Sequence, residues 1–95
     1  MYGQRVSRAL HSPPYQKLRR LLSEARVAAN LTQSQVAEKM QRPQSFVSKY
    51  EGGERHLDVV EFVDLCAAIG ISPSRVIDAL TGPNLQNVGA ARRAR

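Results

Sequence analysis

The sequence predicts an all-α fold, a compact domain of five helices. Three predicted helix starts carry a hydrophobic staple, an apolar pair that flanks the residue capping the helix. These pairs are Leu31 and Val36, Leu57 and Phe62, and Ile71 and Val76. No segment alternates apolar and polar residues as a strand does. Ninety-five residues suffice for one small hydrophobic core and not for two.

Helical periodicity fills the middle of the chain. We expect a flexible arm over residues 1–12, a folded domain over 13–81 and a disordered basic tail over 82–95, which is small and polar. No apolar run approaches the length of a membrane span, and the first residues lack the apolar core of a secretion signal. The single cysteine, Cys66, lies in an apolar run and is read as a buried small residue. These features suit a cytoplasmic protein.

The first helix is expected from Tyr15 to about Ala29. Its inward positions at helical spacing are Tyr15, Leu18, Leu22 and Ala25. Ser12-Pro13-Pro14 precedes them, and proline is tolerated in the first turn of a helix.

Two short helices follow, over about 33–40 and 44–51. Thr32 and Gln35 form a capping box at the start of the first one. Pro43 breaks that helix and is expected near the first position of the next. The second helix turns Phe46, Val47 and Tyr50 inward and ends at Gly52-Gly53.

The last two helices repeat the same start signals. Asp58 is the cap and Glu61 its capping-box partner for a helix that runs to about Ile69 and stops at Gly70. Ser72-Pro73 is expected to open the last helix by the same logic, and it ends near Leu80.

Charge is unevenly distributed along the chain. The net charge is +6, but residues 1–50 hold nine Lys or Arg against two Glu, whereas residues 51–80 hold two Arg against six acids. Such a division indicates that the basic part of the chain contacts a polyanion and that the acidic part contacts something else. Charge alone would favour an ordinary basic surface over a surface for nucleic acid.

Residues 31–55, LTQSQVAEKMQRPQSFVSKYEGGER, resemble the helix-turn-helix of the Cro and lambda-repressor-like (XRE) family of DNA-binding regulators. The matching features are the L-T-Q opening, Ala37 at the helix crossing, Val47 and Tyr50 as core anchors, and the S-x-x-Y-E-x-G ending. The resemblance extends over about residues 15–80. It implies a lambda-repressor-like domain that regulates transcription, as a repressor, by binding double-stranded DNA in the nucleoid.

Three residues depart from the family's pattern. Gln41 stands where the family usually has Gly, Arg42 where it has an apolar residue, and Pro43 where it has a Ser or Thr cap. At Gln41 the turn therefore needs either a left-handed residue or a different turn geometry.

The helix over 44–51 is the one expected to read bases. A major groove about 12 Å wide admits a helix whose exposed side chains offer hydrogen-bond donors and acceptors. Gln44 and Ser45 hold the first two exposed positions and Lys49 lies on the same face. The resemblance assigns base contacts to these same three residues.

Several other polar residues are candidates for contacts to backbone phosphates. Gln33 lies at a helix N-terminus, where free N–H groups attract an anion, and its side chain can also brace Gln44. The further candidates are Thr32, Arg42, Ser48, Arg55 and His56. No second histidine or carboxylate cluster accompanies His56, so we expect no metal site and no cofactor.

The resemblance implies two structural contacts. Arg26 and Glu51 are expected to form a partly buried ion pair, the alternative being that Arg26 touches DNA. Ile77 and Leu80 on the last helix are expected at the contact between two copies, so the predicted assembly is a homodimer.

Alternative functions are weighed against this reading. An antitoxin that binds its own promoter and a toxin partner is compatible with the short length. An enzyme is not expected, because no Ser-His-Asp set, carboxylate pair or phosphate-cradling Gly loop occurs. RNA binding lacks the exposed aromatic side chains that stack on unpaired bases.

Overall fold

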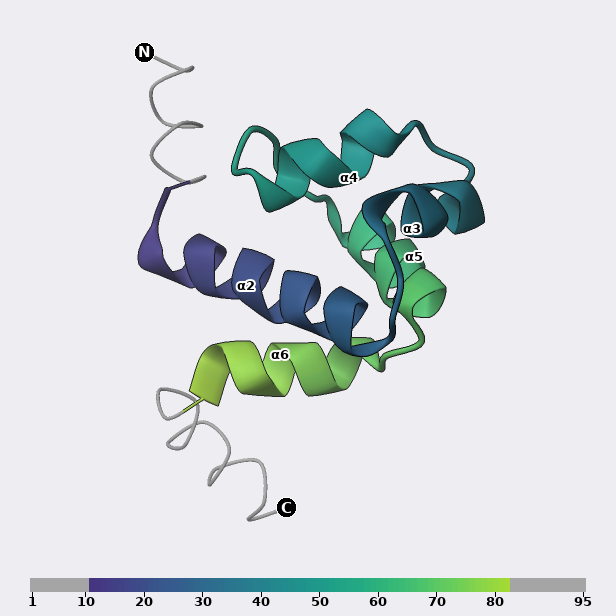
Figure 1. Cartoon of the computed structure of the whole chain (residues 1–95). Coiled ribbons are helices and arrows are strands. Elements are labelled where there is room, and N and C mark those ends of the chain that lie inside the picture. The colour runs from purple at the N-terminus through teal and green to yellow at the C-terminus, as the bar shows by residue number, and fades with distance from the viewer. Residues whose placement is uncertain (1–10, 83–95) are drawn as a thin grey trace.

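A computed structural model describes residues 11–82, and five α-helices make up most of this range (Figure 1). In chain order they are α2 (Pro13–Ala28), α3 (Gln33–Met40), α4 (Gln44–Glu51), α5 (Val59–Ile69) and α6 (Pro73–Thr81). No strand occurs within residues 11–82, so the predicted all-α fold is confirmed. The predicted arm and tail lie almost wholly outside the described residues.

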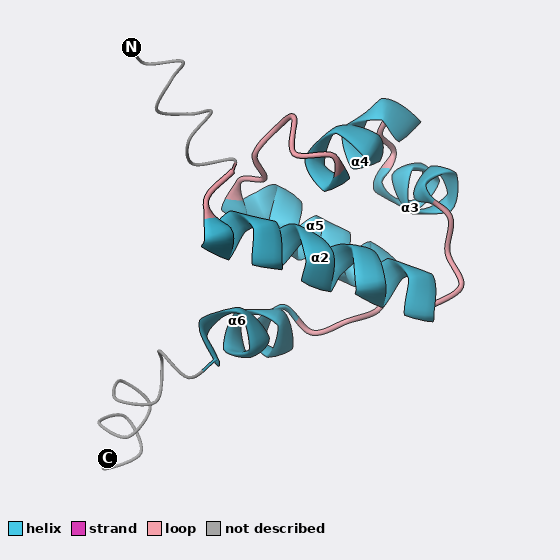
Figure 2. Ribbon diagram, turned by 60° about the vertical axis from the view of Figure 1, so that its left-hand side comes forward, coloured by secondary structure: helices cyan, strands magenta, loops and turns pink. Residues whose placement is uncertain are grey.

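The longest helix, α2, runs through the middle of the bundle. It contacts α4 and α5 on one side and α6 on the other, and α3 packs against both α4 and α5. Figures 1 and 2 both show α2 between α4 and α6. The outer sides of α4 and α6 therefore belong to opposite faces of the molecule.

Two helix starts are held by complete capping boxes. The N–H of Gln35 donates to Thr32 Oγ1 over 3.0 Å, and the N–H of Thr32 donates to Gln35 Oε1 over 2.8 Å. Asp58 and Glu61 exchange the same two bonds at the start of α5, over 2.7 and 3.1 Å. Each box pairs two N–H groups that would otherwise have no partner at a helix start.

Three details of the predicted helix starts were wrong. Pro43 is the residue before α4 and not its first residue: its ψ of 151° is extended, which its fixed φ allows. The Ser72 hydroxyl caps no backbone N–H of α6 and instead bonds the Ser74 hydroxyl over 2.9 Å. Helix α2 runs from Pro13 to Ala28, because Ser12 already accepts the N–H of Tyr15.

The connection from α3 to α4 turns at Gln41 in the left-handed conformation. Its φ is 57°, and the next N–H, of Arg42, donates to the Ala37 carbonyl over 2.9 Å. The sequence left open whether this turn has a left-handed residue or a different geometry, and the structure has the left-handed residue. Gly70, with φ 89°, ends α5 in the same way but without a side chain to strain.

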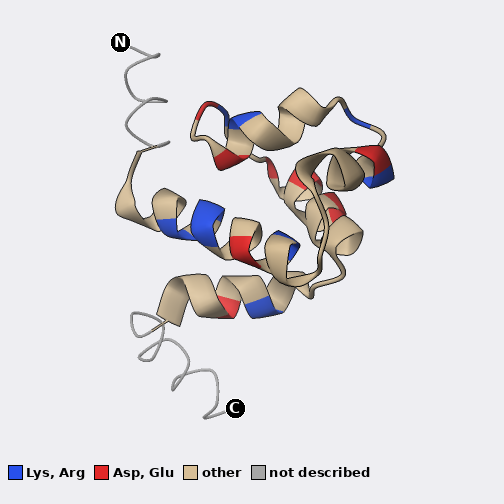
Figure 3. Ribbon diagram, in the orientation of Figure 1, with Lys and Arg blue, Asp and Glu red and all other residues tan. Residues whose placement is uncertain are grey.

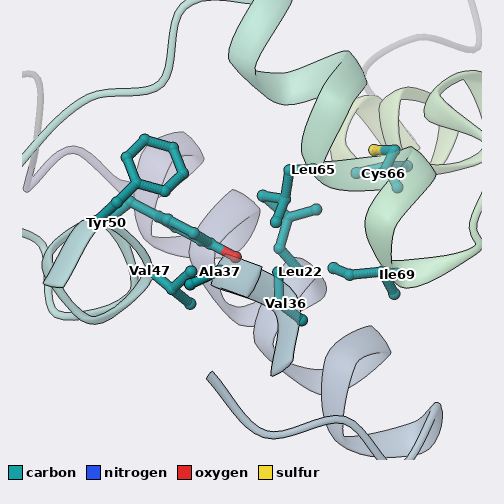
Figure 4. Close-up of a cluster of buried hydrophobic side chains, with 10 residues drawn as sticks. Leu22, Val36, Ala37, Val47, Tyr50, Leu65, Cys66 and Ile69 are labelled. Carbon is teal, nitrogen blue, oxygen red and sulfur yellow. The ribbon is translucent and has the colours of Figure 1, made fainter. Parts of the chain in front are cut away.

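The core lies between α2, α3, α4 and α5, and α6 closes it. Figure 4 shows most of its side chains. The buried residues are Leu22, Val36, Ala37, Phe46, Val47, Tyr50, Leu65, Cys66, Ile69 and Val76. Cys66 is fully buried, and burial raises the pKa of its thiol to about 11. At neutral pH the thiol is therefore protonated, which leaves it an unreactive core residue.

Candidate nucleic-acid interface

Helix α4 divides cleanly into a core face and a solvent face. Phe46, Val47 and Tyr50 are buried, as predicted, and they fix how the helix is rotated about its axis. The residues predicted to read bases, Gln44, Ser45 and Lys49, are all exposed. The outer face of α4 therefore offers an amide, a hydroxyl and an ammonium group to a partner.

A continuous hydrogen-bonded chain connects the interior to the first residue of α4. Arg26 on α2 donates through Nε and Nη2 to Glu51, over 2.8 and 3.1 Å. Gln33 Nε2 donates to Glu51 Oε1 over 2.9 Å. Gln44 Nε2 then donates to Gln33 Oε1, also over 2.9 Å. The ion pair predicted for Arg26 and Glu51 and the bracing of Gln44 by Gln33 are thus parts of one network.

The network fixes which way the amide of Gln44 points. The ionised carboxylate of Glu51 can only accept hydrogen bonds, so Gln33 must present its NH₂ to Glu51 and its oxygen to Gln44. Gln44 therefore gives one N–H to Gln33. Its other N–H and its Oε1 take no part in this network, and a glutamine amide that offers one donor and one acceptor can bind adenine through two hydrogen bonds.

The ion pair at the base of this network is nearly buried. The side chains of Arg26 and Glu51 are 13% and 8% exposed. Arg26 also donates through Nη1 to the Leu31 carbonyl over 2.8 Å, which holds the connection between α2 and α3. The hydrogen bond to Glu51 raises the pKa of the Arg26 guanidinium against the opposing effect of burial.

Beside the network lies an open hollow of about 590 Å³, where the end of α2 meets the starts of α3 and α4. Thr32, Gln33 and Gln44 contribute to its wall. The N-terminus of α3 opens into this region, which places its free N–H groups where an anion can approach.

The remaining phosphate candidates are held in different ways. Ser48 turns its hydroxyl back to the Ser45 carbonyl over 3.3 Å. His56 packs against Tyr15 with the two rings tilted and their centroids 5.2 Å apart. The Tyr15 hydroxyl also accepts the N–H of Leu57, over 2.6 Å, so α2 anchors the loop after α4.

Arg42 and Arg55 share one carboxylate, a contact that the sequence reading missed. Arg42 Nη2 donates to Glu61 Oε2 over 2.7 Å. Arg55 donates to both oxygens of Glu61, over 3.1 and 3.3 Å. Glu61 was predicted only as a capping-box residue, and no sequence spacing links it to two arginines on other segments.

The charges of the described residues nearly cancel. Residues 11–82 contain nine Lys or Arg and eight Asp or Glu, a balance of +1, so five of the six net positive charges come from outside this range. Figure 3 shows both signs spread over the helices, with the ribbon of α4 mostly uncharged. Some of the basic residues in the N-terminal half of the sequence, Arg26 and Arg42, therefore form ion pairs with acids within the fold.

An apolar surface lies on the side of α5 and α6. Ile77 is 42% exposed and Leu80 is partly buried. The sequence reading missed Val59, Val60 and Val63, which are 76%, 69% and 44% exposed. A small groove of about 170 Å³ lies next to them, lined in part by Leu57, Phe62, Ile77 and Leu80.

Within residues 11–82, no group of three or more His, Cys, Asp or Glu side chains could hold a metal ion. None of the helices described there is long and apolar enough to cross a membrane.

Comparisons with known proteins agree with this geometry. The family model of a helix-turn-helix domain matches residues 17–80. An XRE-family like protein from Pseudomonas syringae pv. tomato str. DC3000 is 49% identical, with a TM-score of 0.72 over 77% of this chain and 89% of that one. Among curated proteins, none matches.

Two restriction-modification controller proteins are also similar in structure. C.AhdI from Aeromonas hydrophila is 29% identical, with a TM-score of 0.61 over 65% of this chain and 94% of that one. A variant of C.Esp1396I is 20% identical, with a TM-score of 0.69 over 79% and 95%, and shows the likeness of the fold alone. The family match, the XRE-like relative and the exposed polar face of α4 lead to one conclusion: the chain belongs to the XRE family of helix-turn-helix DNA-binding transcriptional regulators.

Proposed function

We propose that the protein is a repressor that reads a specific DNA sequence with α4 in the major groove. Gln44 reads adenine, while Ser45 and Lys49 contact neighbouring base edges. The observation that carries this is the chain from Arg26 through Glu51 and Gln33 to Gln44, since it leaves Gln44 with one free donor and one free acceptor.

Phosphate contacts position the helix in this proposal. Gln33 and Thr32 at the start of α3 bind one strand of the backbone, because free N–H groups and the helix dipole favour an anion there. Further contacts come from Ser48 on α4 and from Arg42, Arg55 and His56 in the segments before and after it.

We infer that two copies bind together as a homodimer. One domain touches few base pairs, too few to select one site in a genome, and two recognition helices about 34 Å apart read an inverted repeat. Ile77 and Leu80 contribute to the contact, and the exposed Val59, which lines the same groove, adds to it. Because an inverted repeat has two half-sites, we infer that a second copy of this chain covers the apolar surface.

The test is Gln44→Ala on a duplex selected from a random pool by the wild-type chain. We expect specific binding to weaken by about 1–3 kcal/mol, with folding unchanged, because one bidentate base contact is removed. Gln16→Ala, another exposed glutamine near a helix start, is the matched control and should leave binding unchanged. Equal losses on selected and random duplexes would contradict base reading by Gln44.

The antitoxin alternative stays a prediction. A toxin gene beside this one would favour it over a free-standing repressor. No catalytic activity is proposed. We place the protein in the cytoplasm at the nucleoid, which fluorescence of a tagged chain would test.

A further inference from the structure

The cluster of Arg42, Arg55 and Glu61 connects both ends of α4 to one point on α5. Arg42 immediately precedes Pro43 and α4, and Arg55 lies in the loop after it. Glu61 lies in the first turn of α5. A single carboxylate therefore restrains the segments before and after the recognition helix.

Phe46 of α4 lies beneath this cluster. The guanidinium carbons of Arg42 and Arg55 are 4.4 and 4.7 Å from the centroid of the Phe46 ring. Both cations are attracted by the ring's electrons. Pro43 supplies no side-chain cap to α4, and these contacts on Phe46 help to hold the first turn of the helix.

Glu61 is itself rigidly placed. Its N–H donates to Asp58 Oδ1 and its Oε1 accepts the N–H of Asp58, in the capping box of α5. Its two oxygens accept four hydrogen bonds in all, three of them from the two arginines, and its side chain is only 12% exposed. The carboxylate cannot turn away without losing several bonds at once.

The two arginines keep unused donors. A guanidinium has five N–H groups, of which Arg42 gives one and Arg55 two to Glu61. Their side chains are 39% and 35% exposed. Two cations share one anion, so one positive charge remains, which suits a phosphodiester with its single negative charge.

We propose that Glu61 is a positioning residue for DNA recognition: it aims Arg42 and Arg55 together at one backbone phosphate and so sets the angle at which α4 enters the groove. Its role rests on the DNA-reading function proposed above. A phosphate contact fixes the register of a protein on DNA and carries no sequence information itself. Loss of Glu61 should therefore reduce discrimination between sequences although Glu61 touches no base.

The variant that tests this role is Glu61→Gln in the full chain. The amide keeps one oxygen for the capping box and an arginine, but its nitrogen cannot accept, so one guanidinium is released. We expect binding to a random duplex to strengthen, and the slope of log affinity against log salt to steepen by about one phosphate. The affinity ratio between the selected and random duplexes should fall about tenfold, within the range that one base pair contributes.

Glu54→Gln is the matched control, since Glu54 is an exposed acid in the same loop as Arg55. It removes the same charge and should strengthen both affinities equally, with the ratio unchanged. Arg42→Ala should lower that ratio in the wild-type chain but far less in the Glu61→Gln chain, because the two residues act together.

Two outcomes would overturn the role of Glu61. One is an unchanged ratio and salt slope in Glu61→Gln together with a lower melting temperature, which would make Glu61 structural only. The other is a fall of the ratio in Glu54→Gln equal to that in Glu61→Gln. A wild-type chain that prefers no duplex over random DNA would instead overturn the proposed function, and the role of Glu61 with it.

Discussion

At the scale of single residues, the Arg26–Glu51 pair serves both stability and recognition. Removal of one partner leaves a nearly buried charge without compensation, at a cost of about 3–5 kcal/mol. We therefore expect Glu51→Ala to lower the melting temperature clearly, whereas Lys49→Ala, two residues earlier and exposed, should not change it. Arg26→Ala that kept its melting temperature and lost only DNA affinity would contradict a structural role and favour a direct DNA contact by Arg26.

Glu61 makes stability depend on pH in the acid range. Burial alone raises the pKa of its carboxyl, but hydrogen bonds from Arg55, from the Asp58 backbone and from Arg42 outweigh burial, and the pKa falls from 4.5 to about 2. Since the folded value lies below the unfolded one, the stabilisation is complete above pH 4.5 and is lost as pH falls towards 2. Urea titrations across this range should give Glu61→Gln a flatter pH dependence than wild type. Equal slopes would contradict the shift.

Sequence reasoning located α4's outward residues because a helix repeats every 3.6 residues and Phe46, Val47 and Tyr50 had to face the core. It did not find the sharing of Glu61 by Arg42 and Arg55. That contact joins segments up to 19 residues apart, and its geometry depends on how α4 and α5 pack. The spacing of residues within one helix gives no information on contacts between separate segments.

At the scale of elements, the turn before α4 stores strain at Gln41. A side chain in the left-handed conformation costs about 1–2 kcal/mol, and glycine avoids most of this cost. We expect Gln41→Gly to raise the free energy of unfolding by about 1 kcal/mol, less any entropy lost to the more flexible unfolded chain. Denaturant unfolding would measure it, with Gln35→Gly, in the helical part of α3, as the control that should destabilise. A loss of stability in Gln41→Gly would contradict the left-handed turn.

The helix starts also show where local sequence suffices. Thr32 with Gln35 and Asp58 with Glu61 form the capping boxes that their spacing predicts, because both bonds of a box lie within one turn. Ser72 has the same position before α6 and makes no such bond. The third residue of that helix is Arg75, whose side chain cannot accept a hydrogen bond from the Ser72 N–H. The sequence therefore cannot form a complete capping box at this helix start.

At the scale of the whole molecule, α2 lies between the recognition helix and α6, which carries the apolar residues Ile77 and Leu80. A change at these residues should therefore alter assembly without altering the reading of one half-site. We expect Ile77→Glu to reduce cooperative binding to an inverted repeat far more than binding to a single half-site. Ala79→Glu, an exposed position on the same helix that does not line the groove, is the control. One chain per duplex with undiminished specificity on an asymmetric site would contradict the dimer.

The single cysteine makes the unmodified protein its own reporter of folding. Because the Cys66 thiol is fully buried and its pKa is raised to about 11, a maleimide or disulfide reagent reaches it only when the helices part. The labelling rate, divided by that of an unfolded chain, then gives the free energy of opening. A bound duplex adds its own binding energy to the closed state, so labelling should slow as duplex is added. Affinity can thus be followed by mass spectrometry at a group remote from the DNA, with no engineered label to disturb the surface that binds it.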